Sequence, residues 1–326
     1  ALKLDKPGDY TLIVGERMGD ESGVEFPVSI PEVPTFALDL ALPVGEIHGR
    51  ISTRDGTPLA GIPVNYEVEG RGSIFMLDMG RNVTSDDDGR FVLRRLKPAS
   101  YTLRVGARNF GTFFGDKPNY GTVVRSGIVV KADQIVEGVD VRLDAAGKIA
   151  GKVLGADGKP AMGASVFVRD NGGRIVNPLS GCSSNADGVF EFEGAAPGAY
   201  TVSARADQLS SRESAPVQVL EGQTANVEVR LEPGTTLRVL VEDGDGKLVR
   251  AGVRVLDDAG RDFSNMLGQD AFETVMTEGF SSTEQRFGPL PSGKYRVLVT
   301  GPDGAGANKP VTLSGQDERS LRVRLQ

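Results

Sequence analysis

Only two residues of this chain ordinarily act as a soft nucleophile or as a general base near neutral pH, one cysteine and one histidine. Cys182 lies in the segment SGCSSN and His48 in EIHGR, far apart in the sequence. A Cys–His pair would need contact between them, a group that orients the imidazole and an oxyanion site. No G-x-S-x-G segment follows an expected strand, so a serine hydrolase is not indicated either. We predict that the chain is not an enzyme and uses no cofactor.

Three short acidic turns suggest calcium loops at first sight. They cover residues 86–89 (DDDG), 185–188 (NADG) and 243–246 (DGDG). An EF-hand loop needs an oxygen ligand of the Asp type at its first position, and that position would be Thr84, Ser183 or Val241. Asx-Gly hairpin turns explain all three segments, so no metal site is predicted.

The composition indicates which elements must carry these residues. The chain has 43 glycines in 326 residues, about twice the usual share, which argues against long helices. Apolar residues make up 39% and charged residues 25%, enough for a folded core. The net charge of −7 gives no footprint for nucleic acid, and no apolar run is long enough for a membrane span.

Three segments align with one another and define an internal repeat. Tyr101, Tyr200 and Tyr295 mark the same point in each, and the aligned segments are residues 49–143, 151–231 and 237–325. A repeat of this length is a domain in its own right rather than a solenoid unit.

Each repeat has the pattern of short strands. In FEFEG (190–194) and NVEVRL (226–231), apolar and polar residues alternate, so one strand face is buried and the other is solvated. Turn sequences such as DG and NADG separate the strands. About seven such strands per repeat fit an antiparallel sandwich.

The motif of the second repeat resembles the carboxypeptidase regulatory-like group, whose relatives include transthyretin-like and CnaB-type domains. The residues that carry it are Gly151, Gly158, Pro160, Gly163, Val166, Gly188, Phe190, Phe192, Pro197, Gly198, Tyr200 and Thr201. The first repeat departs from it at Ala99, and the third lacks a recognisable D-x-x-G-x-F segment. The resemblance implies an all-β chain of tandem Ig-like (prealbumin-like) antiparallel β-sandwiches in an elongated array.

We expect four parts. Residues 1–44 are the C-terminal part of an incomplete repeat, because Pro7, Gly8, Tyr10 and Thr11 match the tyrosine motif while the opening strands are missing. The three repeats occupy residues 45–145 (with insertions at 71–80 and 109–121), 146–232 and 233–326. The incomplete unit is completed either by upstream residues of a longer protein or by strands of another chain. Short linkers predict repeats stacked end to end and semi-rigidly.

Some residues of the motif invite a structural role. We interpret Tyr10, Tyr101, Tyr200 and Tyr295 as tyrosine corners that close the end of each core. CnaB-type relatives suggest a Lys–Asn or Lys–Asp isopeptide bond, for which Lys152, Asn226 and either Glu191 or Glu193 are the candidates. The alternation places all four side chains in solvent, so we predict no cross-link.

Two insertions of the first repeat are rich in large apolar residues. The first contains Ile74, Phe75, Met76 and Leu77, for which we expect packing against a neighbouring repeat. The second places Phe110, Phe113, Phe114 and Tyr120 in a glycine-rich loop. The second set is either a loop that binds carbohydrate or protein, or another interdomain contact, and packing is the favoured interpretation.

The sequence therefore favours a non-catalytic structural or adhesive stalk segment of a larger exported bacterial surface or appendage protein. One alternative is an accessory module that binds carbohydrate or protein through the aromatic loop. Another is a subunit of a strand-exchanged filament. The expected partners are neighbouring domains of the same protein, with carbohydrate or another surface protein as further candidates, and the expected location is extracellular or the cell surface, with the periplasm as an alternative.

Overall fold

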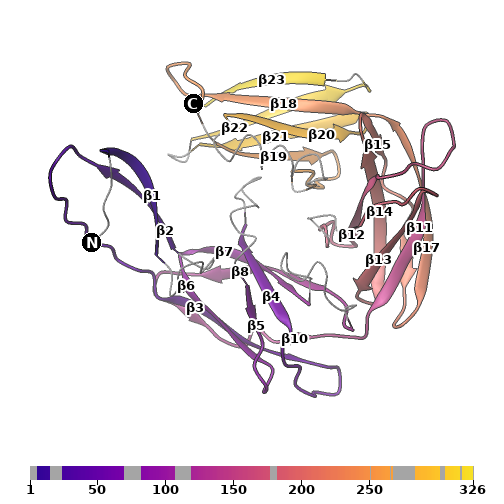
Figure 1. The fold of residues 1–326 in the computed structure, drawn as a ribbon, viewed down its shortest axis with the longest axis horizontal. Helices are drawn as coiled ribbons and strands as arrows, with labels where there is room; N and C mark the ends of the chain where they lie inside the picture. Colours follow the sequence, from indigo (N-terminus) through magenta and orange to yellow (C-terminus); the bar gives the residue numbers. More distant parts are fainter. Residues whose placement is uncertain are drawn as a thin grey trace.

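The computed structural model describes residues 6–14, 24–69, 82–106, 119–176, 182–249, 251–264, 266, 283–301, 305–315 and 318–325. Every helix or strand in this part of the chain is a β-strand, which confirms the all-β prediction (Figure 1). No helix in the described ranges has the length and hydrophobicity that a membrane span needs.

The first repeat forms two sheets, ordered β10-β3-β6, with β9 also paired to β3, and β5-β4-β7-β8. Its strands are β3 (Gly45–Ser52), β4 (Pro63–Val68), β5 (Asn82–Thr84), β6 (Arg90–Leu96), β7 (Ala99–Val105), β8 (Val123–Val130), β9 (Ile135–Val136) and β10 (Val141–Arg142).

In the second repeat the two layers are joined into one curved sheet, ordered β12-β14-β15-β17-β11-β13, with β16 also paired to β14. Its strands are β11 (Gly147–Leu154), β12 (Ser165–Asp170), β13 (Val189–Ala195), β14 (Gly198–Ala206), β15 (Leu209–Ser211), β16 (Val217–Val219) and β17 (Thr224–Pro233).

The third repeat again has two sheets, ordered β20-β18-β23 and β19-β21-β22. Its strands are β18 (Thr235–Glu242), β19 (Gly252–Asp257), β20 (Glu284–Leu290), β21 (Gly293–Thr300), β22 (Gly306–Leu313) and β23 (Glu318–Arg324).

All three repeats share one strand topology. The opening strand pairs antiparallel with β6, β13 or β20 and parallel with the closing strands β9/β10, β17 or β23. The antiparallel pair carries a register shift at the start of the opening strand in each case, next to Gly45, Gly147 and Thr235. Because the β-bulge occurs at the same point in all three repeats, it is a feature of the shared fold and not a local irregularity.

A glycine and a phenylalanine of the motif face each other across two paired strands, and the third repeat has neither of them. Gly151 lies opposite Phe190, and a Cβ at this glycine would overlap the Phe190 ring and the carbonyl oxygen of Val227. Gly49 and Phe91 form the same pair in the first repeat. In the third repeat the opposed residues are Val239 and Gln285, so both members of the pair are replaced together.

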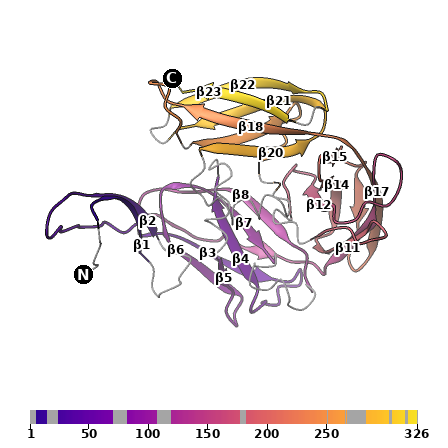
Figure 2. The same ribbon diagram turned by 45° about the horizontal axis from the view of Figure 1, so that its top comes forward.

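The described residues form three clusters of buried apolar side chains, each centred on one repeat. Figure 1 shows that the path through the repeats bends, with β18–β23 turned back above β3–β8. Figure 2 shows the third repeat resting across the end of the second, where β20 contacts β15.

The short linkers predicted that the repeats stack end to end, but the second and third repeats are joined through a strand face instead. Phe167 and Ile175 of the second repeat belong to the core cluster of the third. Phe167 alternates with Val166 and Val168, which face the core of its own repeat. The third repeat therefore covers the outer face of strand β12, because side chains alternate between the two faces of a strand.

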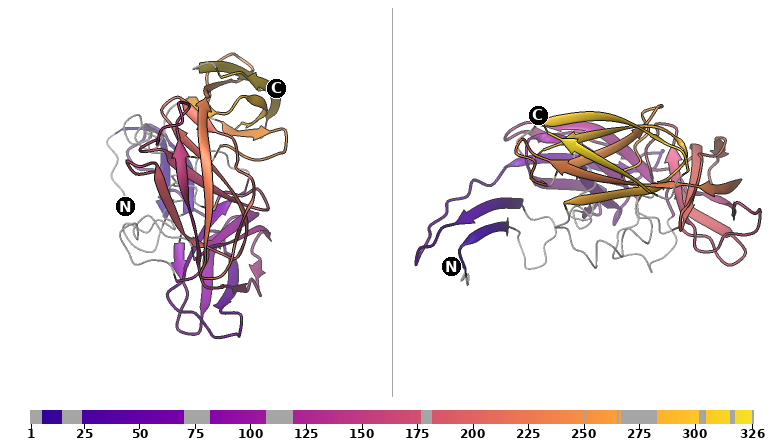
Figure 3. Two further views of the ribbon diagram at one scale, coloured as in Figure 1. Left: turned by 90° about the vertical axis from the view of Figure 1, so that its right-hand side faces the viewer. Right: turned by 90° about the horizontal axis from the view of Figure 1, so that it is seen from above.

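The N-terminal part of the chain stands apart from these sandwiches. Strands β1 (Gly8–Val14) and β2 (Val24–Ile30) form an antiparallel hairpin that pairs with no other described strand. Figure 3 shows it projecting from the body of the molecule. The ammonium of Lys97 lies 5.3 Å from the centre of the Phe26 ring and connects the hairpin to the first repeat.

Candidate functional site: the junction between the second and third repeats

Neither His48 nor Cys182 lies in an arrangement suited to nucleophilic catalysis. The Nε2 of His48 is 2.6 Å from Glu46 and its Nδ1 is 3.1 Å from Glu137, all within the first repeat. Cys182 is buried in the second repeat, where its thiol donates to the carbonyl oxygen of Glu191 at 3.3 Å. Burial raises the pKa of Cys182 to about 12, so the thiolate is not formed near neutral pH.

The acidic turns use their side chains to hold the backbone. The carboxylate of Asp86 accepts hydrogen bonds from the N–H groups of Asp88 and Arg90. The side chains of Asn185 and Asp243 accept two backbone N–H groups in the same pattern. Oxygens engaged in this way stabilise the turn, and the described residues contain no cluster of metal ligands.

Of the residues considered for an isopeptide bond, Lys152, Asn226 and Glu191 are exposed, whereas Glu193 is half-buried. Lys152 and Asn226 are exposed and face different partners across the β11–β17 pair. The lysine beside the two glutamates is instead Lys148, whose ammonium lies 3.0 Å from Glu191 and 3.3 Å from Glu193. Among these residues no lysine is held in an apolar core next to an amide.

The four motif tyrosines make the same hydrogen bond. Each hydroxyl donates to the backbone carbonyl four residues upstream, at 2.6 Å for Tyr10, 2.8 Å for Tyr101, 2.7 Å for Tyr200 and 2.8 Å for Tyr295. Burial raises the pKa of Tyr200 and of Tyr295 to about 12. The hydrogen bond holds the turn that precedes each tyrosine-bearing strand against that strand.

The apolar insertions of the first repeat fall largely outside the described residues. This applies to Ile74, Phe75, Met76 and Leu77 and to Phe110, Phe113 and Phe114. Tyr120 is described, and it packs against the core of the first repeat while its backbone bridges to Ala145. Binding through the aromatic loop stays a prediction.

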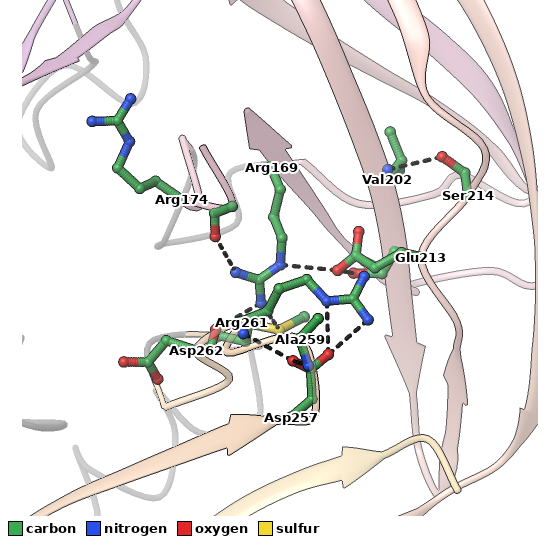
Figure 4. Close-up of polar contacts among 12 residues, drawn as sticks. Arg169, Arg174, Val202, Glu213, Ser214, Asp257, Ala259, Arg261 and Asp262 are labelled. Carbon is green, nitrogen blue, oxygen red and sulfur yellow. Dashed lines mark hydrogen bonds and ion pairs between the residues drawn. The ribbon is translucent and has the colours of Figure 1, made fainter. Parts of the chain in front are cut away.

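A group of buried, hydrogen-bonded polar residues lies between the second and third repeats (Figure 4). Arg169 extends from the outer face of β12 and is 1% exposed. Its Nε donates to Glu213 at 2.9 Å, one terminal nitrogen donates to the carbonyl of Gly173 at 2.9 Å, and the other donates to the carbonyl of Asp262 in the third repeat at 2.7 Å. The guanidinium also lies 5.0 Å from the centre of the Phe263 ring.

A second buried arginine crosses the same junction. Arg205 of β14 donates to the carbonyl oxygens of Met266 at 2.9 Å and Gly288 at 3.3 Å, both in the third repeat. Its guanidinium lies 5.3 Å from the centre of the Phe167 ring. Burial, and then the nearby charge of Arg169, lowers the pKa of Arg205 to about 9, so it remains charged at neutral pH.

The carboxylate of Glu213 compensates part of this buried positive charge. One of its oxygens accepts from Arg169 and, at 3.4 Å, from the hydroxyl of Ser203. A buried charge without a partner costs several kcal/mol, so these contacts stabilise the arrangement in which the groups meet.

The first and second repeats meet in a related way. Arg104, on the outer face of β7, donates to the carbonyl of Ile175 at 2.6 Å and pairs with Glu67 at 3.0 Å. The backbone of Ile175 forms an isolated β-bridge with Arg169. The backbone of Asp262 forms the equivalent β-bridge with Leu256 in the third repeat, so the carbonyls of Ile175 and Asp262 occupy corresponding positions. Arg104 and Arg169 therefore donate to corresponding carbonyls, each in the repeat that follows its own.

Sequence reasoning did not identify this junction. The signal that points to it is Phe167 in SVFVRD, an aromatic residue at a position that alternation assigns to the outer face. Arg169, two residues further along the same strand face, gave no separate sign of a junction, because charged side chains on an outward face are normally solvated.

Comparisons with known proteins agree with the motif. The family model described as the carboxypeptidase regulatory-like domain matches residues 46–144 and 148–232, more than half of the chain. No curated protein sequence matches.

Similar solved structures include the Bacillus anthracis TIE protein, with 16% identity, 87% of this chain and 51% of that chain covered and a TM-score of 0.24, so this chain spans about half of its length. The minor pilin of Streptococcus agalactiae shows 15% identity, with 58% and 97% covered and a TM-score of 0.28. The major pilin subunit of Bacillus cereus shows 10% identity, with 86% and 99% covered and a TM-score of 0.20.

Proposed function

This chain belongs to the carboxypeptidase regulatory-like domain family, and we propose that its repeats form a non-catalytic structural module that holds neighbouring domains in one fixed, bent orientation. The module serves as a stalk or spacer segment of a larger exported surface or appendage protein. Its direct partners are the adjacent domains of that protein.

The observation that carries this proposal is the sharing of one core across a domain boundary. Phe167 and Ile175 of the second repeat are buried with Phe263 and Met266 of the third. Around this apolar contact, Arg169 and Arg205 donate to backbone carbonyls of the third repeat. Backbone carbonyls are fixed in space by the strands and turns that carry them, so these bonds select one orientation.

The energetics favour a rigid junction over a hinge. Removing one partner of a buried, hydrogen-bonded charge pair typically costs about 3–5 kcal/mol. Opening the junction would expose Phe167 and leave the guanidinium of Arg169 without Asp262, so the open state is rarely populated.

The proposal is tested by measuring the distance between the two repeats. Spin labels are attached at the exposed Lys159 and Lys294 after substitution to cysteine, while the buried Cys182 is retained. Pulsed electron paramagnetic resonance is expected to give one narrow distance distribution for the parent chain and a broad one after Arg169→Ala.

The matched control is Arg90→Ala, which removes an arginine from the exposed pair with Asp88. Exposed pairs contribute at most about 1 kcal/mol, so the distribution should stay narrow. A broad distribution in the parent chain would contradict a fixed orientation. Circular dichroism identifies any variant whose repeats have unfolded.

The surface location is tested separately. Antibodies against the folded chain should label intact cells of the source organism. Labelling that requires lysis would contradict an exported stalk and would leave the fixed junction untouched.

A further inference from the structure

The N-terminal hairpin repeats the geometry of a hairpin in the complete sandwiches. In β1–β2, Gly8 pairs with Ile30 and Tyr10 with Val28. In β21–β22, Gly293 pairs with Leu313 and Tyr295 with Val311, in the same order and register. The tyrosine hydroxyl bonds to the carbonyl four residues upstream in both cases. Residues 6–30 therefore correspond to the late strands of a repeat.

The residues after the hairpin continue this correspondence. Leu38, Leu40 and Leu42 follow Ile30 at the same spacing at which Leu321, Val323 and Leu325 follow Leu313. Val227, Val229 and Leu231 follow Val219 at that spacing too. In the second and third repeats these positions lie on or next to the closing strand, with their side chains toward the core.

The burial of these equivalent positions differs sharply. Leu231 and Leu325 are 0% and 7% exposed, whereas Leu42 at the corresponding position is 41% exposed. Leu38 is also 41% exposed, while its counterparts Val227 and Leu321 are half-buried. Half of the large apolar side chains that are exposed among the described residues lie within residues 33–44, namely Val33, Phe36, Leu38, Leu42 and Val44. So much apolar surface on one short segment indicates an interaction site.

The complete repeats show what covers this face elsewhere. The opening strands β11 and β18 run parallel to the closing strands β17 and β23 and hydrogen-bond along them. The second strand, β12 or β19, pairs antiparallel with the tyrosine strand β14 or β21. In the described part of the chain, residues 31–44 belong to no strand, and β1 pairs only with β2.

We propose that residues 8–14 and 24–42 form an acceptor surface for the opening strands of a repeat of this same class. The first incoming strand runs parallel to residues 36–42 and directs branched apolar side chains inward on either side of a glycine, as Ile149 and Val153 do around Gly151 in β11. The second incoming strand pairs with the free edge of β1. The backbone gains its missing hydrogen bonds, and the exposed leucines become core.

The test supplies these strands from the chain itself. Residues 147–196 are fused directly before Pro7 of the full chain, so that Ala196 takes the place of Lys6 and continues into the tyrosine motif. Hydrogen–deuterium exchange is measured for the amides of residues 36–42. We expect exchange at least about 100-fold slower than in the parent chain, because amides in a paired strand exchange only on opening.

The matched control carries Ile149→Asp and Val153→Asp in the fused segment alone, which places charges on the inward face. These amides should then exchange as in the parent chain. Equal protection in both fusions, or no protection in either while the third repeat stays protected, would overturn the proposal. A parent chain that dimerises by light scattering with residues 36–42 protected would also overturn it, because a second copy would then be the occupant.

Discussion

Single side chains close each sandwich, and in the second and third repeats they make the fold sensitive to alkaline pH. Tyr101, Tyr200 and Tyr295 are buried and donate their hydroxyls to backbone carbonyls, so each ring contributes both apolar area and one hydrogen bond. Cys182 contributes only as a small apolar group, since its thiol is buried and protonated.

Replacing Tyr200 by phenylalanine should reduce the free energy of unfolding of the second repeat by about 1–2 kcal/mol. The ring stays in place, but the carbonyl of Ala196 loses its hydrogen-bond donor. Urea denaturation measures this change. Tyr10→Phe is the matched control and should have a smaller effect, because the corresponding bond of Tyr10 is exposed. Equal losses in both variants would contradict a role that depends on burial.

Cys182 should lower stability at high pH. Its pKa is raised by burial to about 12 from an ordinary value of 9.0, so the folded state holds a proton that the unfolded state releases. The stabilisation is complete below about pH 9 and is lost as pH rises toward 12. One pKa unit corresponds to about 1.4 kcal/mol.

The parent chain should therefore lose about 2–3 kcal/mol more than Cys182→Ala between about pH 8 and pH 11, in denaturation curves recorded across that range. The raised pKa values of Tyr200 and Tyr295 act in the same direction and are common to both proteins. Parallel stability curves for the two proteins would contradict the buried thiol.

At the scale of strands, the fit between facing elements decides which residues the motif requires. Phe190 of β13 packs over Gly151 of β11, and the closing strand β17 approaches the same glycine from the other side. A strand glycine is unfavourable by itself, and here it provides the space that the ring occupies. The third repeat reaches the same topology with Val239 and Gln285, which shows that the pair matters more than either residue.

Gly151→Ala should destabilise the second repeat by about 1–3 kcal/mol, because the new methyl group overlaps Val227 and the Phe190 ring. Guanidinium denaturation provides the measurement. Gly244→Ala is the control, since a Cβ there meets no atom within 4 Å. If Gly151→Ala left the free energy of unfolding unchanged, β11 and β17 would have to move apart without an energetic cost, which would contradict this prediction.

At the scale of the whole molecule, the second and third repeats share a core, and we therefore expect them to behave as one body. Phe167 and Ile175 lie in the cluster of the third repeat, while Val124 of the first repeat lies in that of the second. The backbone N–H of Thr122 also donates to Gly194 across the earlier junction, at 2.8 Å. We therefore expect cooperativity to extend across the domain boundaries.

Calorimetry should show one unfolding transition for the second and third repeats together. Phe167→Ala should cost about 3–5 kcal/mol and lower the temperature of that shared transition or divide it in two. Phe91→Ala removes an equally buried ring from the first repeat alone and serves as the comparison. Independent transitions in the parent chain would contradict a shared core.

The sequence motifs predicted much of this fold, and particular residues show which features they did not predict. Alternation around Phe190 and Val229 marks strands and their inward faces, and the turns at Asp86 and Asn185 are visible as Asx-Gly sequences, because both features depend on neighbours in the chain. Alternation also placed Lys152 and Asn226 outward, where the structure has them. Arg169 and Arg205 follow the same outward pattern, yet they are buried.

The amino-acid sequence by itself determined the all-β class, the repeat and the strand faces, since local periodicity and turn chemistry suffice for these. Only the tertiary structure decided that one outward face is solvated and another is covered. A period of two reports which side of a strand a residue occupies, and it carries no information about a second domain on that side. The bent junction and the uncovered leucines of residues 36–42 both depend on what lies across the face, so they emerged only when the strands were placed in space.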